Sequence, residues 1–345
     1  MPEASVCCPN KNKKWWTNKL FLVTAFILIL VIFSYIFPAF EAFRTVLFQY
    51  FKSIWWAVAL GLFLGGVIDY YVPREYISKI LSRKSPLTII NAVFLGFLMS
   101  ACSHGILALS MQLHKKGASN PAVVSFLLAS PWANIAVSMM LVSLFGLKGV
   151  IIILSAIIIA INTGFIFIFL EKKGLIETNK NSIVVPLGYS IRTDFFARAK
   201  SYKFGLNYLS RDIKGVTSGL IMLSQMVLWW ILLGMLIASL AGAFIPAHLF
   251  HRFMGPNLLG LIVTLALATV IEVCSEGSSP LAFEIYRQTG SLGNSFVFLM
   301  AGVVTDYTEI GLLWSNVGRK VALWMPVVTV PQVVVLGYIF NLFIK

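Results

Sequence analysis

Residues 272–280 read EVCSEGSSP, a polar stretch in the middle of the apolar segment 257–286. Residues 100–105, SACSHG, interrupt the apolar segment 86–114 in the same way. Pro280 brings no N–H to a helix, and the glycines of both stretches weaken helix formation. Backbone that leaves a helix inside a bilayer must be buried in protein or line a cavity. The two stretches therefore predict broken membrane helices that surround a binding site.

Both stretches belong to an internal repeat. Matched landmarks are Trp55-Trp56 and Trp229-Trp230, Gly61 and Gly234, Pro73 and Pro246, and Cys102 and Cys274, at offsets of 172 to 174 residues. A constant offset over this distance indicates two homologous halves, a common plan among transporters, whose substrate site lies between the halves near the bilayer midplane. If each half crosses the bilayer four times, the two repeats are parallel.

The composition is that of a membrane protein. Hydrophobic residues make up 59% of the chain and charged residues only 12%, whereas soluble chains have about 25% charged residues. Apolar stretches near the ~20 residues that a bilayer requires cover 20–37, 50–72, 86–114, 118–146, 149–170, 216–245, 257–286, 291–316 and 321–343. We therefore predict an all-α polytopic membrane protein with about nine transmembrane helices.

The same stretches suggest a division of the chain. We expect a cytosolic tail and an uncleaved anchor helix in 1–45, a first membrane repeat in 46–170, a polar linker in 171–215 and a second membrane repeat in 216–345. The four cysteines are too few for a disulfide framework. We expect the chain to lie in the cell inner (plasma) membrane, with several passes.

The net charge of +14 is concentrated in short basic clusters between the apolar stretches. The clusters lie at 11–19, 74–84, 115–116, 172–173, 192–214 and 319–320. Such clusters set membrane topology and meet anionic lipid headgroups, so we expect no nucleic-acid partner. The clusters 11–19 and 192–214 both favour the cytoplasm, but the five predicted spans between them would place them on opposite sides. A re-entrant segment or a misplaced cluster would explain this conflict.

Acidic residues mark the second half. Glu272, Glu276, Asp306 and Glu309 lie inside two central apolar segments, although the chain has only 13 acidic residues in all. A charged carboxylate at mid-bilayer costs about 2.5–3.5 kcal/mol, and the stretches 254–285 and 289–317 contain no Lys or Arg. Protons, cations, hydroxyls or backbone donors must therefore be the partners, and we expect some of these carboxyls to be protonated at rest. We predict that Glu272, Asp306 and Glu309 carry the coupling protons.

The candidate cargo ligands are Cys102, His104, Cys274 and Glu276. Thiolate, imidazole and carboxylate together suit zinc, copper(I) or a trivalent metalloid, whereas magnesium prefers oxygen alone. Further substrate-binding candidates are Ser103, Ser130, Asn134, Ser275 and Ser279. Purely structural roles are open for several of these residues: the cysteines as packing residues, His104 as a hydrogen-bonding partner of a neighbouring helix, and the serines as points of close helix approach.

The motifs resemble those of the predicted permeases related to the ArsP organoarsenical efflux permeases. The matching segments are Cys102-Ser103-His104-Gly105, Lys115-Lys116-Gly117, Ser130-Pro131-Trp132-Ala133-Asn134 and the stretch from Cys274 to Leu281, within 50–320. His104 and Glu276 stand where the family has a second Cys, and Ala108 stands where it has Pro. The second Ser-Pro motif is replaced by Ala301-Gly302-Val303 before Thr305-Asp306. The resemblance implies a permease, and these departures favour a divalent metal over an arsenical.

Our hypothesis is an ion-coupled secondary transporter that exports a soft metal or metalloid species. The alternatives are a permease for a small organic or sulfur-containing solute, a membrane-embedded enzyme that uses Cys or Glu with His104, and a non-catalytic assembly subunit. The chain has no G-x-x-x-x-G-K-[ST] or H-E-x-x-H motif, so direct ATP use and metalloprotease chemistry lack support. We expect no enzymatic activity and no cofactor. The expected partners are the transported small cation or metalloid and the lipid bilayer, and homo-oligomerisation is left open.

Overall fold

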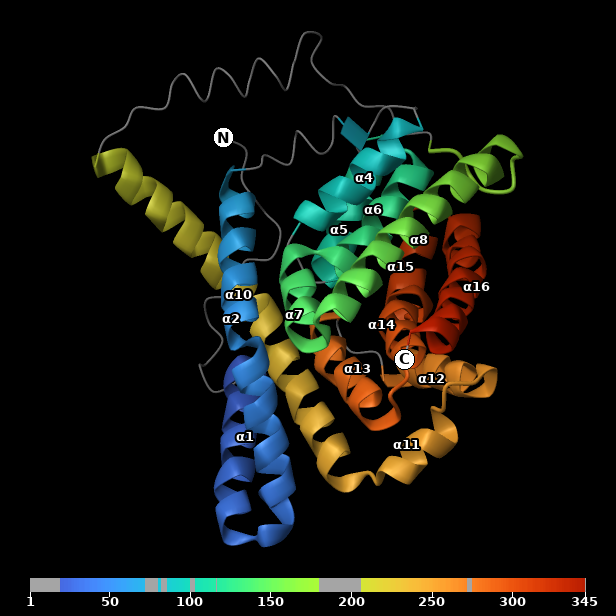
Figure 1. Ribbon diagram of the computed structural model, residues 1–345. Helices are drawn as coiled ribbons and strands as arrows, with labels where there is room; N and C mark the ends of the chain where they lie inside the picture. The colour runs from blue at the N-terminus through green and yellow to red at the C-terminus, as the bar shows by residue number, and fades with distance from the viewer. Residues whose placement is uncertain are drawn as a thin grey trace.

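The computed structural model describes residues 19–71, 80–81, 86–99, 103–115, 117–179, 206–271 and 275–344, and all their secondary structure is helical (Figure 1). The helices are α1 (Lys19–Ile36), the 3₁₀ helix η2 (Pro38–Phe40), α2 (Glu41–Tyr71), α4 (Leu87–Leu98), α5 (Ser103–Lys115), α6 (Asn120–Ala133), α7 (Ile135–Phe145), α8 (Leu147–Lys172), α10 (Leu206–Phe244), α11 (Ala247–Phe253), α12 (Leu258–Ile271), α13 (Ser275–Thr289), α14 (Leu292–Thr305), α15 (Tyr307–Asn316) and α16 (Arg319–Phe343). The predicted all-α class is confirmed.

Five helical stretches in the described part of the chain are long and apolar enough to cross a membrane. They are α1, the stretch Pro38–Leu64, α8, the pair α14 and α15, and α16. The pair α6 and α7, bent by 41°, makes a sixth, and α10 contributes the shorter apolar stretch Leu228–Phe244. The polytopic membrane architecture is therefore confirmed, but the predicted count of about nine separate spans is not.

The segment 86–114, expected to be one span, forms a hairpin of two short helices. α4 runs beside α6 in the same direction, since Gly96 near its end packs against Ala129 and the Met99 carbonyl accepts from Ser130 Oγ at 3.2 Å. α5 then returns along α6, because the turn at Gly117 joins the end of α5 to the start of α6. A helix of this length spans only about 20 Å, so each arm reaches part of the way through a bilayer.

The segment 257–286 folds in the same way. Thr264 and Thr269 of α12 bond to Asn294 at 3.2 Å and Thr305 at 2.8 Å, which places α12 parallel to α14. α13 returns along α14, to which it is joined by a turn at Gly290. The starts of α5 and α13, of α6 and α14, and of α8 and α16 are each 172 residues apart. The hairpins are thus equivalent parts of the internal repeat.

The two halves run in opposite directions. Glu177, just after α8, lies at the starts of both α6 and α16, since its carbonyl accepts from Asn120 at 2.5 Å and its carboxylate from the Lys320 N–H at 3.3 Å. At the other end of the bundle, Asn341 of α16 donates to Asn294 near the start of α14 at 2.9 Å. The expectation of parallel repeats is therefore wrong. With α10 counted as a span, each half crosses three times instead of four, because its hairpin does not cross. An odd number of passes inverts the second repeat.

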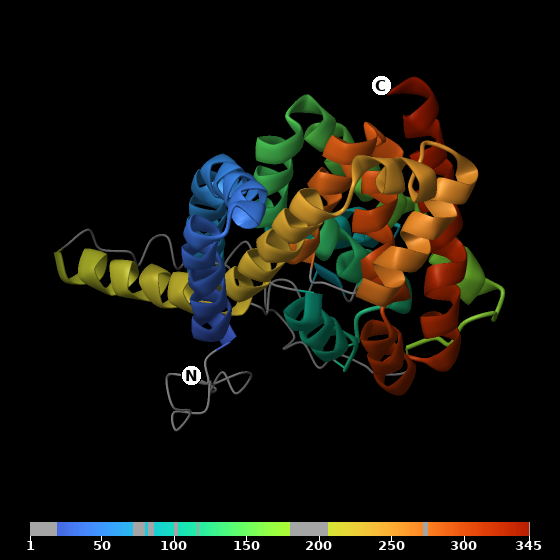
Figure 2. The ribbon, with the colours of Figure 1, turned by 90° about the horizontal axis from the view of Figure 1, so that it is seen from below.

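We call the end of the bundle where α2 and α8 finish the linker face, and the opposite end, where α16 finishes, the C-terminal face. Tyr70 at the end of α2 donates to Asp212 near the start of α10 at 2.9 Å, so these two long helices are also antiparallel. They stand with α1 to one side of the other helices (Figures 1 and 2). The first hairpin lies in the half of the bundle at the linker face, and the second lies at the C-terminal face (Figure 1).

This topology removes the conflict between the basic clusters. Among the described residues, α1, α2, α6–α7 and α8 cross between the tail and the linker, and this even number of passes is consistent with both clusters lying on one side. Lys115, Lys172, Lys173, Arg319 and Lys320 of the other clusters lie at helix ends on the same linker face, and in the sequence the cluster 74–84 lies between α2 and α4, which also end and begin there. The C-terminal face has isolated basic residues such as Lys148, Arg252 and Arg287. The positive-inside rule therefore predicts a cytoplasmic linker face.

We expect the N-terminal tail and the linker to be cytoplasmic and the C-terminus to face outward. The native Cys7 and Cys8 can report on the tail in a chain whose Cys102 and Cys274 are changed to Ser. A membrane-impermeant maleimide should label this chain in inside-out vesicles and not in intact cells, and a cysteine added after Lys345 should show the reverse pattern. Labelling of both ends from the same side would contradict the topology.

Candidate functional site

The span formed by α6 and α7 is broken at Asn134. Pro131 lies inside the last turn of α6 and brings no N–H to the helix, which weakens the ladder just before the break. Asn134 has extended backbone, with φ −66° and ψ 161°, and its N–H donates to the Ser130 carbonyl at 3.0 Å. Its side-chain oxygen accepts from the Val137 N–H at 2.8 Å and caps α7. A single side chain therefore satisfies backbone groups that the break exposes.

The same side chain reaches the second half of the protein. Asn134 Nδ2 donates to Glu276 Oε1 at 3.5 Å, and Glu276 lies in the first turn of α13 with only 1% of its surface exposed. The positive end of the α13 dipole favours a carboxylate at this position. Ser279, one turn further along α13, is fully buried. The break of the first half and the hairpin of the second half thus meet at a buried acid.

The matching break of the second half carries two more acids. Asp306, 172 residues after Asn134, joins α14 to α15 and is 5% exposed. Its N–H donates to the Gly302 carbonyl at 3.1 Å, and its carbonyl accepts from the Ile310 N–H at 3.0 Å. Glu309, in the first turn of α15, is 1% exposed. Carboxylates buried at a helix break in a membrane protein are costly, which makes them candidates for ion binding.

The structure describes the predicted site only in part. It brings Asn134 and Glu276 together, and it places the buried Ser130 against the end of α4 through Met99. Ser103 and His104 open α5 and Ser275 opens α13, but their side chains lie outside the described part, as do Cys102, Glu272 and Cys274 altogether. Among the side chains that the structure describes, no group of three His, Cys, Asp or Glu residues is placed to hold a metal ion. The proposed ligand set therefore stays a prediction.

Glu284 is an interacting buried acid that sequence reasoning missed. It is fully buried on α13 and accepts from Arg287 at 2.8 and 3.0 Å, from Gln288 at 2.7 Å and from the Tyr50 hydroxyl of α2. Gly242 of α10 packs against Glu284 and Arg287, since a Cβ on Gly242 would lie 2.5 Å from Glu284 Oε1. The spacing of Glu284, Arg287 and Gln288 along one helix face is a signal that could have revealed the cluster. The cluster ties α13 to α2 and α10.

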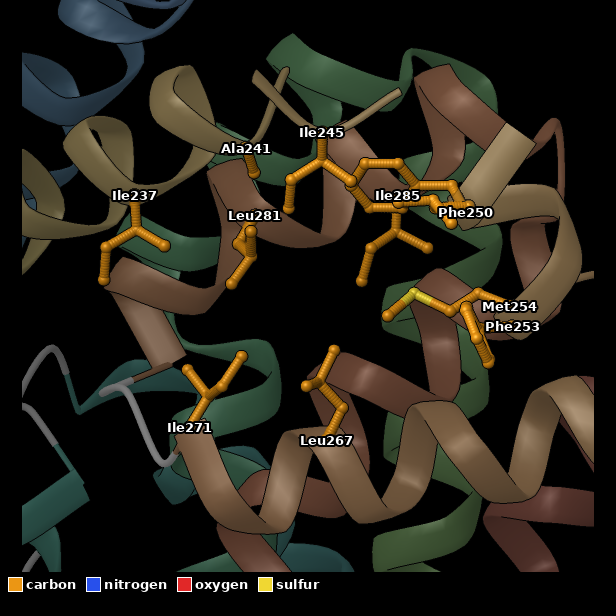
Figure 3. Close-up of a pocket in the computed structure, with 11 residues that line it drawn as sticks. Ile237, Ala241, Ile245, Phe250, Phe253, Met254, Leu267, Ile271, Leu281 and Ile285 are labelled. Carbon is orange, nitrogen blue, oxygen red and sulfur yellow. The ribbon is translucent and has the colours of Figure 1, made fainter. Parts of the chain in front are cut away.

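An apolar cavity of about 340 Å³ lies beside the second hairpin (Figure 3). It is lined by Ile237, Ala241, Ile245, Leu249, Phe250, Phe253, Met254, Leu267, Ile271, Leu281 and Ile285, from α10 to α13. Ile271 is the last residue of α12, directly before Glu272 in the sequence. The cavity therefore reaches the end of α12.

Substituting Asn134 tests this geometry. We expect Asn134→Ala to lower the free energy of unfolding by about 1–2 kcal/mol, because it removes both the cap of α7 and a donor to Glu276. Asn162→Ala, at an exposed position of α8, is the matched control and should change stability little. Thermal unfolding of the two variants in detergent provides the measurement, and equal midpoints would contradict the role given to Asn134.

Comparisons with known proteins agree with this arrangement. The family model ArsP_1, described as "Predicted permease", matches residues 39–184 and 212–345. UPF0718 protein YcgR of Bacillus subtilis is 21% identical over 278 residues, which cover 76% of this chain and 84% of that protein. A Streptococcus mutans protein named "Putative two-component membrane permease complex subunit" is 20% identical over 260 residues, 74% of this chain and 80% of that protein. No solved structure matches the chain.

Proposed function

Since the chain belongs to the ArsP_1 family of predicted permeases, we propose that it is an ion-coupled secondary transporter that exports a soft metal or metalloid species across the plasma membrane. The family's description as predicted permeases and a relative named as a subunit of a membrane permease complex favour a transporter over an enzyme. The observation that carries the proposal is Glu276, a carboxylate with 1% exposure at the meeting point of the two halves. A site between inverted repeats, at broken helices, is where secondary transporters bind cargo.

The proposed ligands come from both hairpins. In the sequence, Cys102 lies between α4 and α5 and His104 lies in the first turn of α5. Cys274 lies between α12 and α13 and Glu276 lies in the first turn of α13. Two thiolates, an imidazole and a carboxylate form a set that prefers zinc, copper(I) or arsenite to hard cations. Ser103, Ser130, Asn134, Ser275 and Ser279 would contribute polar contacts, and Glu272, Asp306 and Glu309 would exchange protons. Each half then supplies part of the cargo site.

A second candidate cargo, a small organic or sulfur-containing solute, is favoured by the apolar cavity. Its volume of about 340 Å³ falls in the range of small-molecule pockets, which are mostly apolar with a few polar groups. In this alternative the acids would serve only for coupling. Transport that is insensitive to the combined Cys102→Ser and Cys274→Ser substitutions would favour it.

We expect Glu276→Gln to reduce transport of at least one soft cargo by about 10–100-fold, since losing one group of a metal's immediate environment has effects of this size. Uptake of zinc, copper(I) and arsenite would be measured separately in inside-out vesicles. Glu41→Gln, on an exposed ion pair at the start of α2, is the matched control and should transport normally. Equal transport by both variants, or no transport of any of the three cargos by the wild type, would count against the proposal.

A further inference from the structure

The two halves differ in how they pack against the pair formed by α2 and α10. By the repeat, α7 corresponds to α15, α13 to α5, and α2 to α10. In the described residues α2 packs along α7 and α10 packs along α13, but no such packing joins α10 to α15 or α2 to α5. Most of the larger remaining contacts occur in matched pairs, as between α6 and α8 and between α14 and α16. The repeat therefore gives two equivalent surfaces, one formed by α7 and α13 and the other by α5 and α15. The α2–α10 pair packs on the first and not on the second.

Two serines at equivalent positions of α7 and α15 show this difference in packing. Ser143 of α7 donates to the Ser53 carbonyl of α2. Its counterpart Ser315 on α15 is exposed and donates within its own helix, to Gly311 at 3.0 Å and Leu312 at 3.2 Å. The same hydroxyl thus binds a neighbouring helix in one half and faces outward in the other.

Glycines at equivalent positions of the two halves show a second difference in packing. Gly234 of α10 touches Gly277 of α13 so closely that a Cβ on Gly234 would lie 2.0 Å from the Gly277 carbonyl oxygen. The equivalent positions, Gly61 on α2 and Gly105 on α5, are also glycine. Glycine inside a helix costs stability unless close approach requires it. The second glycine pair is therefore suited to a helix contact between α2 and α5 that this structure does not contain.

We propose that α5 and α15 form a second docking surface for the α2–α10 pair, which is occupied in the opposite-facing state of the transport cycle. The proposal rests on the transporter function, and the occupant is a part of this chain because the repeat supplies the same contacts for it. When the α2–α10 pair packs on α7 and α13, it covers the second hairpin at the C-terminal face. It does not cover the first hairpin. Movement of the pair to α5 and α15 reverses that relation.

Different charged residues would hold the α2–α10 pair on each of the two surfaces. In the present state the ion pair of Glu284 and Arg287 on α13 lies against Gly242 of α10, and Glu284 accepts a hydrogen bond from the Tyr50 hydroxyl of α2. The residues of α5 equivalent to Glu284 and Arg287 are Gln112 and Lys115, and the residue of α2 equivalent to Gly242 is Asp69. Docking of α2 on α5 brings Lys115 to Asp69 and so supplies an ion pair of its own. The hydrogen bond from Tyr50 to Glu284 thus holds α2 to α13 in the present state, and an ion pair between Lys115 and Asp69 would hold α2 to α5 in the other.

Two cysteine pairs test the two states. Ser53→Cys with Ser143→Cys joins α2 to α7 and reports the present state. Val227→Cys with Ser315→Cys joins α10 to α15 at the equivalent positions and reports the proposed one. In native membranes we expect an oxidant to form an intramolecular disulfide in each pair, and each disulfide to abolish transport until it is reduced. Chains with only one of the added cysteines are the controls.

Glycine substitutions should shift the two crosslinks in opposite directions. We expect Gly61→Leu to slow crosslinking of 227 to 315 by about tenfold or more, and Gly234→Leu to slow crosslinking of 53 to 143 by as much, since the added side chain blocks one docked state. Each substitution should spare the other crosslink, which also shows that the variant is folded.

The outcomes separate this inference from the proposed function. No crosslink between 227 and 315 in a chain that transports normally would overturn the second docking surface alone. A disulfide-linked dimer through Ser315→Cys, or protection of that cysteine by a co-purified partner chain, would also overturn it, because α15 would then be an interface between chains. Both intramolecular crosslinks in a chain that exports no soft metal or metalloid would support the movement and remove the cargo assignment.

Discussion

Backbone groups that leave a helix inside a bilayer must find partners within the protein, and this requirement shapes the centre of the molecule. At the α6–α7 break the side chain of Asn134 caps α7 and also reaches Glu276. The cap is local to the first half, whereas the contact with Glu276 needs the break of one half to lie against the hairpin of the other. Asn134 thus joins the polar centre to the packing of the two halves.

The inverted arrangement follows from the hairpins. An odd number of passes in each half turns the second repeat over, so that α6 and α14, or α8 and α16, run in opposite directions. Inversion places Glu276 of the second half against the Asn134 break of the first. It also provides two equivalent surfaces for the α2–α10 pair, of which this structure uses one. A transporter that exposes its site to either side in turn needs such a choice.

The sequence predicts the helical membrane class, the repeat and the interruption of the apolar segments 86–114 and 257–286, because apolar length, spacing, glycine and proline act locally. It does not predict the hairpins, since an apolar segment such as 257–286 has enough residues for either one long span or two half-length arms. Packing of α12 and α13 against α14 decides between them. The cluster around Glu284 was missed because Tyr50 and Gly242 come from distant helices. The conflict between the basic clusters at 11–19 and 192–214 was the one sequence signal of a re-entrant segment.

The most direct test of a soft-ion site shared by the two halves is metal analysis of chain purified without chelator, followed by X-ray absorption spectroscopy of the bound ion. The account predicts a retained soft metal or metalloid with both sulfur and nitrogen or oxygen ligands, at about 2.3 and 2.0–2.1 Å for zinc. The sulfur signal should disappear when Cys102 and Cys274 are changed to Ser. An ion surrounded only by oxygen, or unchanged retention of a soft ion by that double variant, would contradict the account.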